Sequence, residues 1–165
     1  FVKNRKTWSS GLIFVMALCT LLSACATTPY KTYKDKSLPE REVARIKGVP
    51  YANSNLFWRL LGDVGGTYID KVDRHSTSFY IGPFGWGNAG DVFVLPGKHT
   101  LRVQFKQNDL YAISDLWFVA EPNRTYLVNY KLVGGDSSMV QIWLEDKATG
   151  RPVGGVAGSS DEPNL

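Results

Sequence analysis

Strict alternation of apolar and polar side chains just after Pro96-Gly97 is the feature that most restricts the fold of this chain. The apolar positions are Leu101, Val103 and Phe105, and the polar positions are Arg102, Gln104 and Lys106. Successive side chains of a β-strand point to opposite faces, so this pattern gives one apolar face and one polar face. The segment is therefore predicted as a half-buried strand.

Alternation recurs in two later segments, "RTYLVNYKLV" (124–133) and "MVQIWLED" (139–146). The segment "LYAISDLWFVA" (110–120) is apolar on both faces near its end, which predicts a central strand with a bulge near Ser114-Asp115. Shorter β-rich runs cover 43–46, 67–73 and 91–97. Turn residues separate the runs and no long amphipathic helix occurs, so the chain is predicted to be all-β, an antiparallel β-sandwich.

The N-terminal segment has a different character. Three basic residues within 3–6 precede an apolar run over 11–22, which leads into Leu22-Ser23-Ala24-Cys25. A charged start, an apolar run and small residues before a cut are the layout of a secretory signal. The run has about a dozen residues where a membrane-spanning helix needs roughly 20, so a permanent spanning anchor is the weaker interpretation.

The residues Leu22 to Cys25 resemble the lipobox of bacterial lipoproteins. The resemblance implies a diacylglycerol group on the Cys25 thiol, cleavage just before it, an acyl chain on the new amino group and no other cofactor. An aspartate after the cysteine retains such proteins at the inner membrane. Here Ala26 follows, so the resemblance implies the periplasmic face of the outer membrane. The alternatives are an ordinary core cysteine or a simple N-terminal anchor.

These observations divide the chain into four segments. Residues 1–24 are the predicted signal, 25–40 the lipidated cysteine and a polar tether, 41–153 the β-sandwich and 154–165 a flexible tail. Cys19 lies in the signal, so the mature domain has no disulfide to form. Without the signal, 16 basic residues face 15 acidic ones. No basic face with interleaved aromatic residues is present, which excludes nucleic acid as a partner.

The domain also resembles small bacterial lipoproteins of uncharacterised families with PEGA-like or immunoglobulin-like β-domains. The resemblance lies in Val72-Asp73, in "LPGKHTL" over 95–101, and in "FVAEP" over 118–122 leading to Tyr126. Arg74 replaces the glycine that usually follows Val-Asp, and an aromatic insert comes next. The resemblance implies an immunoglobulin-like sandwich and carries no catalytic residues.

Catalytic and metal-binding patterns are weak. No G-x-S-x-G nucleophile motif occurs, His75 lies in a polar loop, and His99 is predicted at an exposed turn edge. Asp70, Asp73 and His75 lack the spacing of a calcium or zinc site. The chain is predicted not to be an enzyme, and no metal site is predicted.

One segment, "FYIGPFGWGNAGD" (79–91), exceeds what a scaffold needs. Its rings and glycines suit stacking on a sugar or seating a peptide, with Tyr80, Phe84, Trp86 and Asp91 as candidate binding residues. The alternative is a loop that folds its rings back over the core. The predicted function is a non-catalytic binding or assembly module, held to the membrane by its lipid, with an envelope protein as partner. The alternative is a binder of cell-wall glycan, or a weak glycan-active enzyme, that uses this loop.

Overall fold

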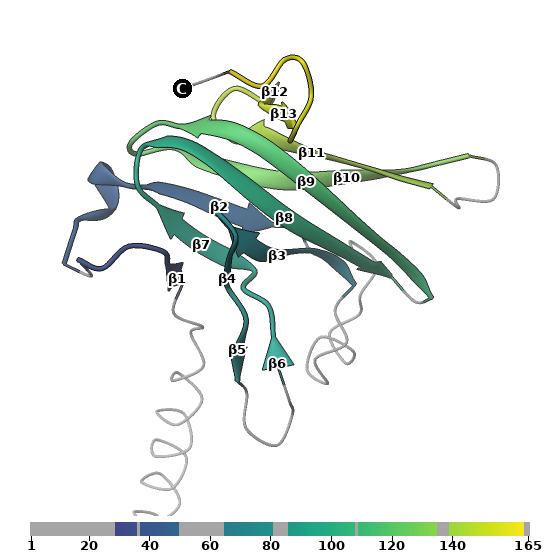
Figure 1. Ribbon diagram of the computed structural model, residues 1–165, viewed down its shortest axis with the longest axis horizontal. Coiled ribbons are helices and arrows are strands. Elements are labelled where there is room, and N and C mark those ends of the chain that lie inside the picture. The colour runs from purple at the N-terminus through teal and green to yellow at the C-terminus, as the bar shows by residue number, and fades with distance from the viewer. Residues whose placement is uncertain are drawn as a thin grey trace, which may run out of the picture.

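The computed structural model describes residues 29–35, 37–49, 65–80, 86–107, 109–134 and 139–163, without the side chains of 79, 80, 86 and 87. Cys25, Phe84 and residues 50–64 lie outside these ranges. The fold is all-β, and two sheets enclose one core (Figure 1). The prediction of an all-β fold is confirmed.

Among the described residues, sheet A has six strands in the order β1-β7-β2-β10-β11-β12. They are β1 (Tyr30–Lys31), β7 (Asp91–Val94), β2 (Ala44–Gly48), β10 (Thr125–Val133), β11 (Met139–Asp146) and β12 (Arg151–Val153). Over the same residues, sheet B has five strands in the order β13-β9-β8-β3-β4. They are β13 (Gly155–Val156), β9 (Leu110–Ala120), β8 (Gly97–Gln107), β3 (Gly66–Val72) and β4 (His75–Ser76).

Two short elements lie outside the sheets. The strands β5 (Phe79–Tyr80) and β6 (Trp86–Gly87) form a separate hairpin, and a 3-10 turn, η1 (Glu40–Glu42), precedes β2. In Figure 1 the β5–β6 hairpin projects from one side of the sandwich, while β12 and β13 lie on the other.

The core lies between the sheets and confirms the alternating patterns. In β8, Leu101, Val103 and Phe105 are buried, whereas the intervening side chains are not. In β10, Tyr126 and Val128 face the same core. Burial of each such side chain contributes about 1.5–3 kcal/mol, so the inward faces of these strands supply much of the stability.

Sheet A is mixed, so the prediction of a wholly antiparallel sandwich is wrong for two ladders. β1 pairs with β7, and β2 with β10, in parallel. Alternation fixes which face of a strand is buried but not which neighbour it pairs with. Sheet B is antiparallel throughout its described ladders.

Within the predicted tether over 25–40, the described residues pack on the domain from Tyr30 onward. Tyr30 and Lys31 pair with β7, and the Thr32 N–H donates to the carbonyl of Phe93 at 3.1 Å. Tyr33 is only 7% exposed and shares a small apolar cluster with Val43, Phe93 and Leu38 on the outer face of sheet A. Isolated rings without periodicity gave no sign of this burial.

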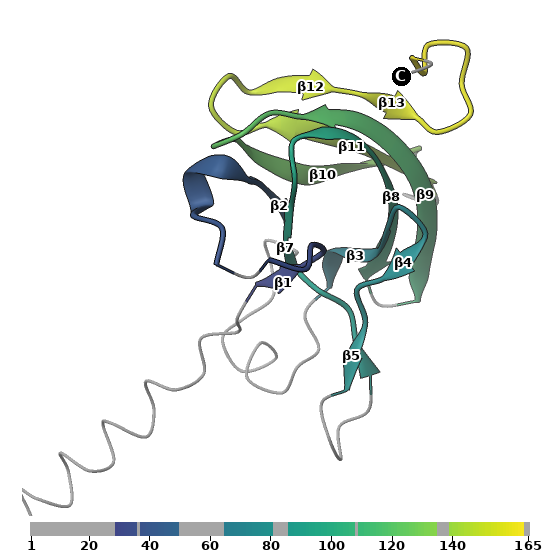
Figure 2. The ribbon, with the colours of Figure 1, turned by 60° about the vertical axis from the view of Figure 1, so that its left-hand side comes forward.

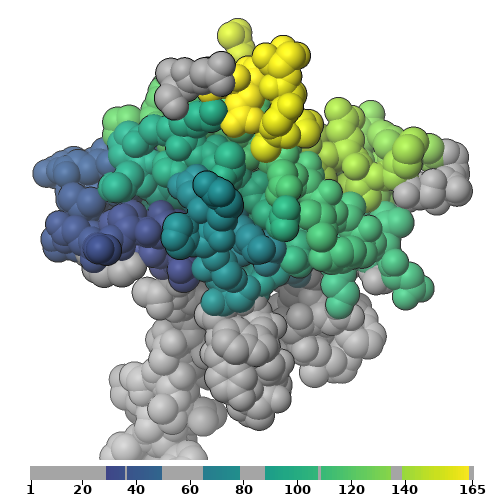
Figure 3. Space-filling view, in the orientation of Figure 1, coloured from purple at the N-terminus to yellow at the C-terminus, as the bar shows by residue number. Residues whose placement is uncertain are grey.

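The predicted flexible tail over 154–165 also contacts the domain. β13 pairs with β9, Lys98 Nζ lies 2.9 Å from a carboxylate oxygen of Glu162, and the Gly158 N–H donates to the same carboxylate. We call residues 151–163 the C-terminal clasp, since β12 lies on the edge of sheet A and β13 on the edge of sheet B (Figure 2). Figure 3 shows the clasp as a cap over the domain.

A tyrosine braces the crossing from β9 in sheet B to β10 in sheet A. The Tyr126 hydroxyl accepts the backbone N–H of Glu121 at 3.0 Å, and its ring meets Phe118 edge-on with centroids 5.0 Å apart. The bond ties the start of the turn 121–124 to β10.

Candidate functional site

The predicted binding residues of 79–91 are only partly described. Tyr80 and Trp86 lie opposite each other in the β5–β6 ladder, but their side chains, like all of Phe84, lie outside the description. Cys25 lies outside it as well. The aromatic binding loop and the lipidation of Cys25 therefore stay predictions.

Asp91 is held in an ion pair across sheet A. Arg45 Nε lies 2.9 Å and 3.1 Å from its two carboxylate oxygens, Arg45 Nη2 also donates to Oδ2, and Lys47 Nζ lies 3.9 Å away. The bond to Asp91 raises the pKa of Arg45, although burial of the guanidinium acts in the opposite direction. Because the Arg45 guanidinium engages both carboxylate oxygens, the pair links β2 to β7.

The carboxylate of Asp73 is also engaged by neighbouring groups. His99 Nδ1 lies 2.7 Å from Asp73 Oδ2, and the Thr100 N–H donates to Oδ1 at 2.9 Å. The other ring nitrogen, His99 Nε2, lies 2.7 Å from the carbonyl of Leu95. His99 is partly buried against Phe118 instead of standing exposed at a turn edge, and the cluster ties the β3–β4 turn to β8.

Metal and pocket candidates are poor over the described ranges. Within them, no group of three or more His, Cys, Asp or Glu side chains is placed to hold a metal ion. A shallow hollow beside β10 is lined by Pro122, Asn123, Arg124, Thr125, Lys147 and Ala148. Arg124 is already paired with Glu121 at 3.3 Å and Asp146 at 3.5 Å, so the hollow offers little to an anion.

The strongest candidate surface is the edge of β9, which was predicted to be a central strand. β13 pairs with β9 only at Leu116 and Trp117, and the Ala157 N–H adds one bond to the carbonyl of Asp115. From Leu110 to Ser114 the strand has β8 on one side and no described strand on the other. The outer end of β9 is therefore an edge, and Figure 1 shows the β8–β9 hairpin extending beyond the clasp.

The ladder also identifies which backbone groups face outward. In an antiparallel pair, the polar groups of a residue all point to one side, and the side alternates along the strand. Since the Asp115 carbonyl points toward β13, those of Tyr111 and Ile113 point the same way, while Ala112 and Ser114 bond to β8. The free edge thus presents the N–H and C=O groups of Tyr111 and Ile113.

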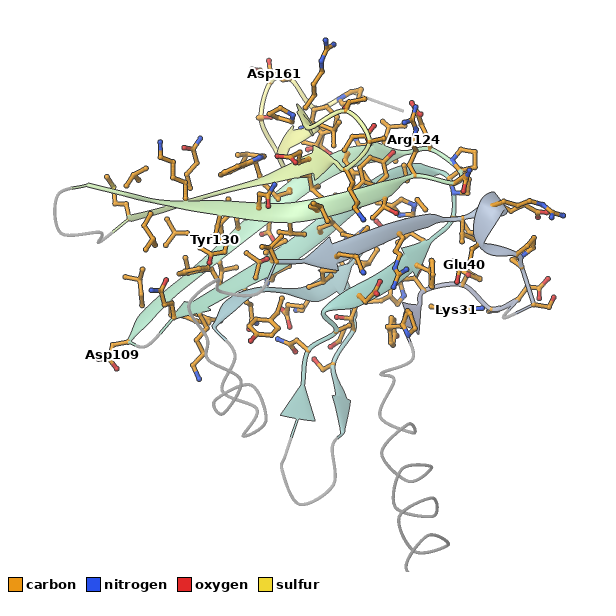
Figure 4. All side chains as sticks on the ribbon, turned by 180° about the vertical axis from the view of Figure 1, so that it is seen from behind. Lys31, Glu40, Asp109, Arg124, Tyr130 and Asp161 are labelled. Atoms are coloured by element: carbon orange, nitrogen blue, oxygen red, sulfur yellow. The ribbon has the colours of Figure 1, made fainter. Side chains whose placement is uncertain are left out.

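The side chains at the same two positions are exposed and apolar. Tyr111 is 57% and Ile113 52% exposed, on the outer face of sheet B. Asp109 marks the hairpin tip in Figure 4, far from Asp161 in the clasp. Natural proteins usually blunt such an edge with charge, proline or a covering segment. On β9 the contacts with the clasp end at Asp115, so the backbone groups of Tyr111 and Ile113 can pair with another strand.

Among the described strands, β12 pairs with β11 only at Leu144 to Asp146, so β11 has an edge of comparable length without a described neighbour. Its exposed positions are Met139 and Gln141, a flexible side chain and a polar one. Aromatic and β-branched side chains favour strand pairing more than these do, so β9 is the better candidate.

The sequence did contain a signal for this edge. Tyr111, Ile113 and Asp115 alternate with Leu110, Ala112 and Ser114. Ala112 and Ser114 are small and suit the inward face of the strand. The larger side chains of Tyr111 and Ile113 therefore lie on the outward face. The apolar run at 116–119 obscured this alternation. The predicted bulge near Ser114-Asp115 is wrong too, because β8 and β9 pair without a shift and the irregularity lies in β3, between Ile69 and Lys71.

No known protein family, curated protein or solved structure matches this chain. In the part of the chain that the structure describes, no helix is long and apolar enough to span a bilayer.

Proposed function

We propose that this protein is a lipoprotein on the periplasmic face of the outer membrane and acts as a non-catalytic module that binds an extended segment of another envelope protein. The proposed anchor is diacylglycerol and an acyl chain on Cys25, supported by the basic start, the short apolar run and Ser23-Ala24. Two or three acyl chains hold a protein on a membrane nearly permanently, at about 0.8 kcal/mol per buried methylene.

The proposed fold type is immunoglobulin-like. Two sheets around one core support it, as does the bond from the Glu121 N–H to the Tyr126 hydroxyl. A tyrosine near the start of a strand that bonds back to the preceding crossing is a hallmark of such sandwiches. Domains of this type bind partners with no catalytic machinery, so this proposal agrees with a binding role.

The observation that supports the binding role is the uncovered edge of β9. Tyr111 and Ile113 offer outward backbone groups and exposed side chains at the same positions. An extended segment that adds to such an edge gains main-chain hydrogen bonds, and alternate side chains determine which segment fits. Both requirements are met on one strand.

The local chemistry specifies the occupant. Opposite Tyr111 and Ile113, the partner strand should carry β-branched or aromatic side chains, which form favourable cross-strand pairs. A basic residue next to the tip would complement exposed Asp109, because Asp115 is already paired with Arg102 at 2.8 Å. The proposed partner is thus an apolar strand with a positive end.

The test is site-specific photocross-linking in native envelopes. A photoreactive side chain replaces Tyr111 in the full lipoprotein, and the matched control replaces Val119, which is also exposed on β9 but lies beyond β13. A discrete adduct at 111, absent at 119, and identified by mass spectrometry, is the expected result. An adduct of twice the chain's own mass would instead assign the edge to a second copy. If neither position gives an adduct, the proposed function is wrong.

A further inference from the structure

The β5–β6 hairpin stands on a fixed base. Its first leg is held by Thr77, which is fully buried and whose N–H donates to the carbonyl of Asp70 at 2.9 Å and whose hydroxyl donates to that of Ile69. Its second leg is held by Ala89, whose carbonyl accepts the Ile69 N–H at 3.1 Å. Both legs are therefore attached to the same point of β3.

The bulge in β3 creates this point of attachment. The register of β3 against β8 shifts between Ile69 and Lys71. A bulge bends its strand and re-aims the groups around the extra residue, and here the carbonyls of Ile69 and Asp70 both reach Thr77. Across the legs, the Ser78 hydroxyl donates to Asn88 Oδ1 at 3.0 Å. The hairpin is a built projection of the domain.

The N-terminal segment enters the domain next to this base. The Tyr30 hydroxyl donates to the carbonyl of Ser76 at 3.3 Å, three residues before β5 begins. In Figures 1 and 4, β1 and the hairpin lie on the same side of the sandwich, away from the clasp. Whatever holds the chain upstream of Tyr30 therefore acts close to the hairpin.

The maximum reach of the chain limits the distance between Cys25 and the hairpin. Residues 26–29 separate Cys25 from Tyr30, and five steps of extended chain span at most about 18 Å. From Ser76 to Tyr80 the chain advances by up to about 13 Å, at roughly 3.3 Å per residue. A surface that holds Cys25 thus lies within about one hairpin length of Tyr30. Tyr80 and Trp86, opposite each other at the outer end of the described ladder, are the residue types that concentrate at membrane interfaces.

We propose that the β5–β6 hairpin rests on the lipid surface that holds Cys25, as a second membrane contact that orients the domain. This inference rests on the proposed lipid anchor. A lipid anchor alone would let the domain rotate, whereas an anchor and a projection with a fixed base on the same side would keep one face toward the membrane. The ladder positions of Tyr80 and Trp86 then face lipid headgroups instead of a sugar.

The test measures contact between Trp86 and the bilayer. The mature chain, attached through Cys25 to vesicles of phosphatidylethanolamine and phosphatidylglycerol, is compared with and without brominated acyl chains, which quench only tryptophans that reach the bilayer. Quenching is expected in the wild type and in the matched control Trp143→Phe, a position on β11. In Trp86→Phe it should fall several-fold. Equal quenching in the wild type and Trp86→Phe would overturn the proposal.

Two further measurements keep the test decisive. In the wild-type chain attached through Cys25, amide exchange at Tyr80 and Gly87 should be several-fold slower on vesicles than in solution. Exchange at the same rate would also contradict the proposal. If mass spectrometry finds no lipid on Cys25, the same chain is coupled through that thiol to a maleimide lipid. The hairpin contact is then tested even if native lipidation fails, and the cross-linking at Tyr111 fails or succeeds independently.

Discussion

Both halves of β9 pair with β8, but they differ on the side of the strand that faces away from β8. In the half from Leu116 to Ala120, β13 pairs with Leu116 and Trp117, and Leu116, Phe118 and Ala120 are buried. From Leu110 to Ser114 none of the described strands lies on the side away from β8, and Tyr111 and Ile113 are exposed. The inner half belongs to the core, whereas the outer half carries the edge that we propose as the binding surface.

The clasp makes this difference. It runs along the edges of both sheets as β12 and β13, then ends in the turn held by Lys98 and Glu162. A clasp a few residues longer along β9 would occupy the positions beside Tyr111 and Ile113. The boundary between the core and the proposed binding surface therefore lies at the bond from the Ala157 N–H to the Asp115 carbonyl.

The largest expected effect is in the covered half. Phe118→Ala removes a fully buried ring that packs against Tyr126 and His99, and should lower the free energy of unfolding by about 3–5 kcal/mol. Ile113→Ala in the uncovered half should change it by only about 0.5 kcal/mol. Urea unfolding of both variants measures the contrast. Similar losses would mean that the two halves are equally part of the core.

The next effect depends on the direction of backbone groups. Ser114→Pro removes an N–H that bonds to β8 and should cost about 3 kcal/mol, because the bond is lost and the ring crowds the partner strand. Ile113→Pro removes an N–H that points outward, and should change stability by less than about 1 kcal/mol. Thermal unfolding compares the two variants.

The same pair separates folding from binding. Ile113→Pro keeps the β8–β9 ladder but removes a donor from the free edge, so it should abolish the photo-adduct at Tyr111. If Ile113→Pro binds the partner as well as the wild type, strand addition is not the mode of binding.

The third expected effect is a displacement of the clasp from β9. Gly154 has φ +71°, and a Cβ there would lie 1.9 Å from the Trp117 carbonyl oxygen. Gly154→Ala should therefore cost about 2 kcal/mol and displace β13. Amide exchange at Trp117 should rise toward that of Ile113, whereas exchange in β8 should stay slow. Gly158→Ala, also at positive φ but with open space around its Cβ, is the matched control.

The sequence predicted the strands better than it predicted their neighbours. The alternation over 101–106 and 124–133 identified inward faces that the structure confirms, because each pattern depends only on which side meets the core. It did not predict that β2 pairs with β10 or that Tyr30 pairs with β7, since these pairings depend on long-range packing. Short polar or glycine-rich segments, such as those around Tyr33 and Val156, were predicted as a tether and a tail for the same reason.

The candidate surface was missed for a related reason. An edge strand and a central strand differ by the presence of a neighbour, and the neighbour here is a three-residue contact from the clasp. The aromatic segment 79–91 has an unusual composition and was therefore predicted as a site, whereas the segment around Tyr111 and Ile113 has the composition of an ordinary strand. Only the strand topology shows that Tyr111 and Ile113 lie on an edge.

The smallest expected effect is a pH dependence of the clasp. The Gly158 N–H, and after it Lys98, hold the pKa of Glu162 below its ordinary value. A carboxylate with a lower pKa in the folded state stabilises the fold above its unfolded pKa of about 4.3, and this contribution is lost as pH falls through the folded value. Exchange at Ala157, corrected for its intrinsic pH dependence, should therefore rise below about pH 4. In Glu162→Gln that rise should be absent, while Asp161→Asn, one residue away, should keep it. If acid frees the Ala157 N–H equally in all three chains, Glu162 does not hold the clasp, and the boundary on β9 depends on the β-ladder alone.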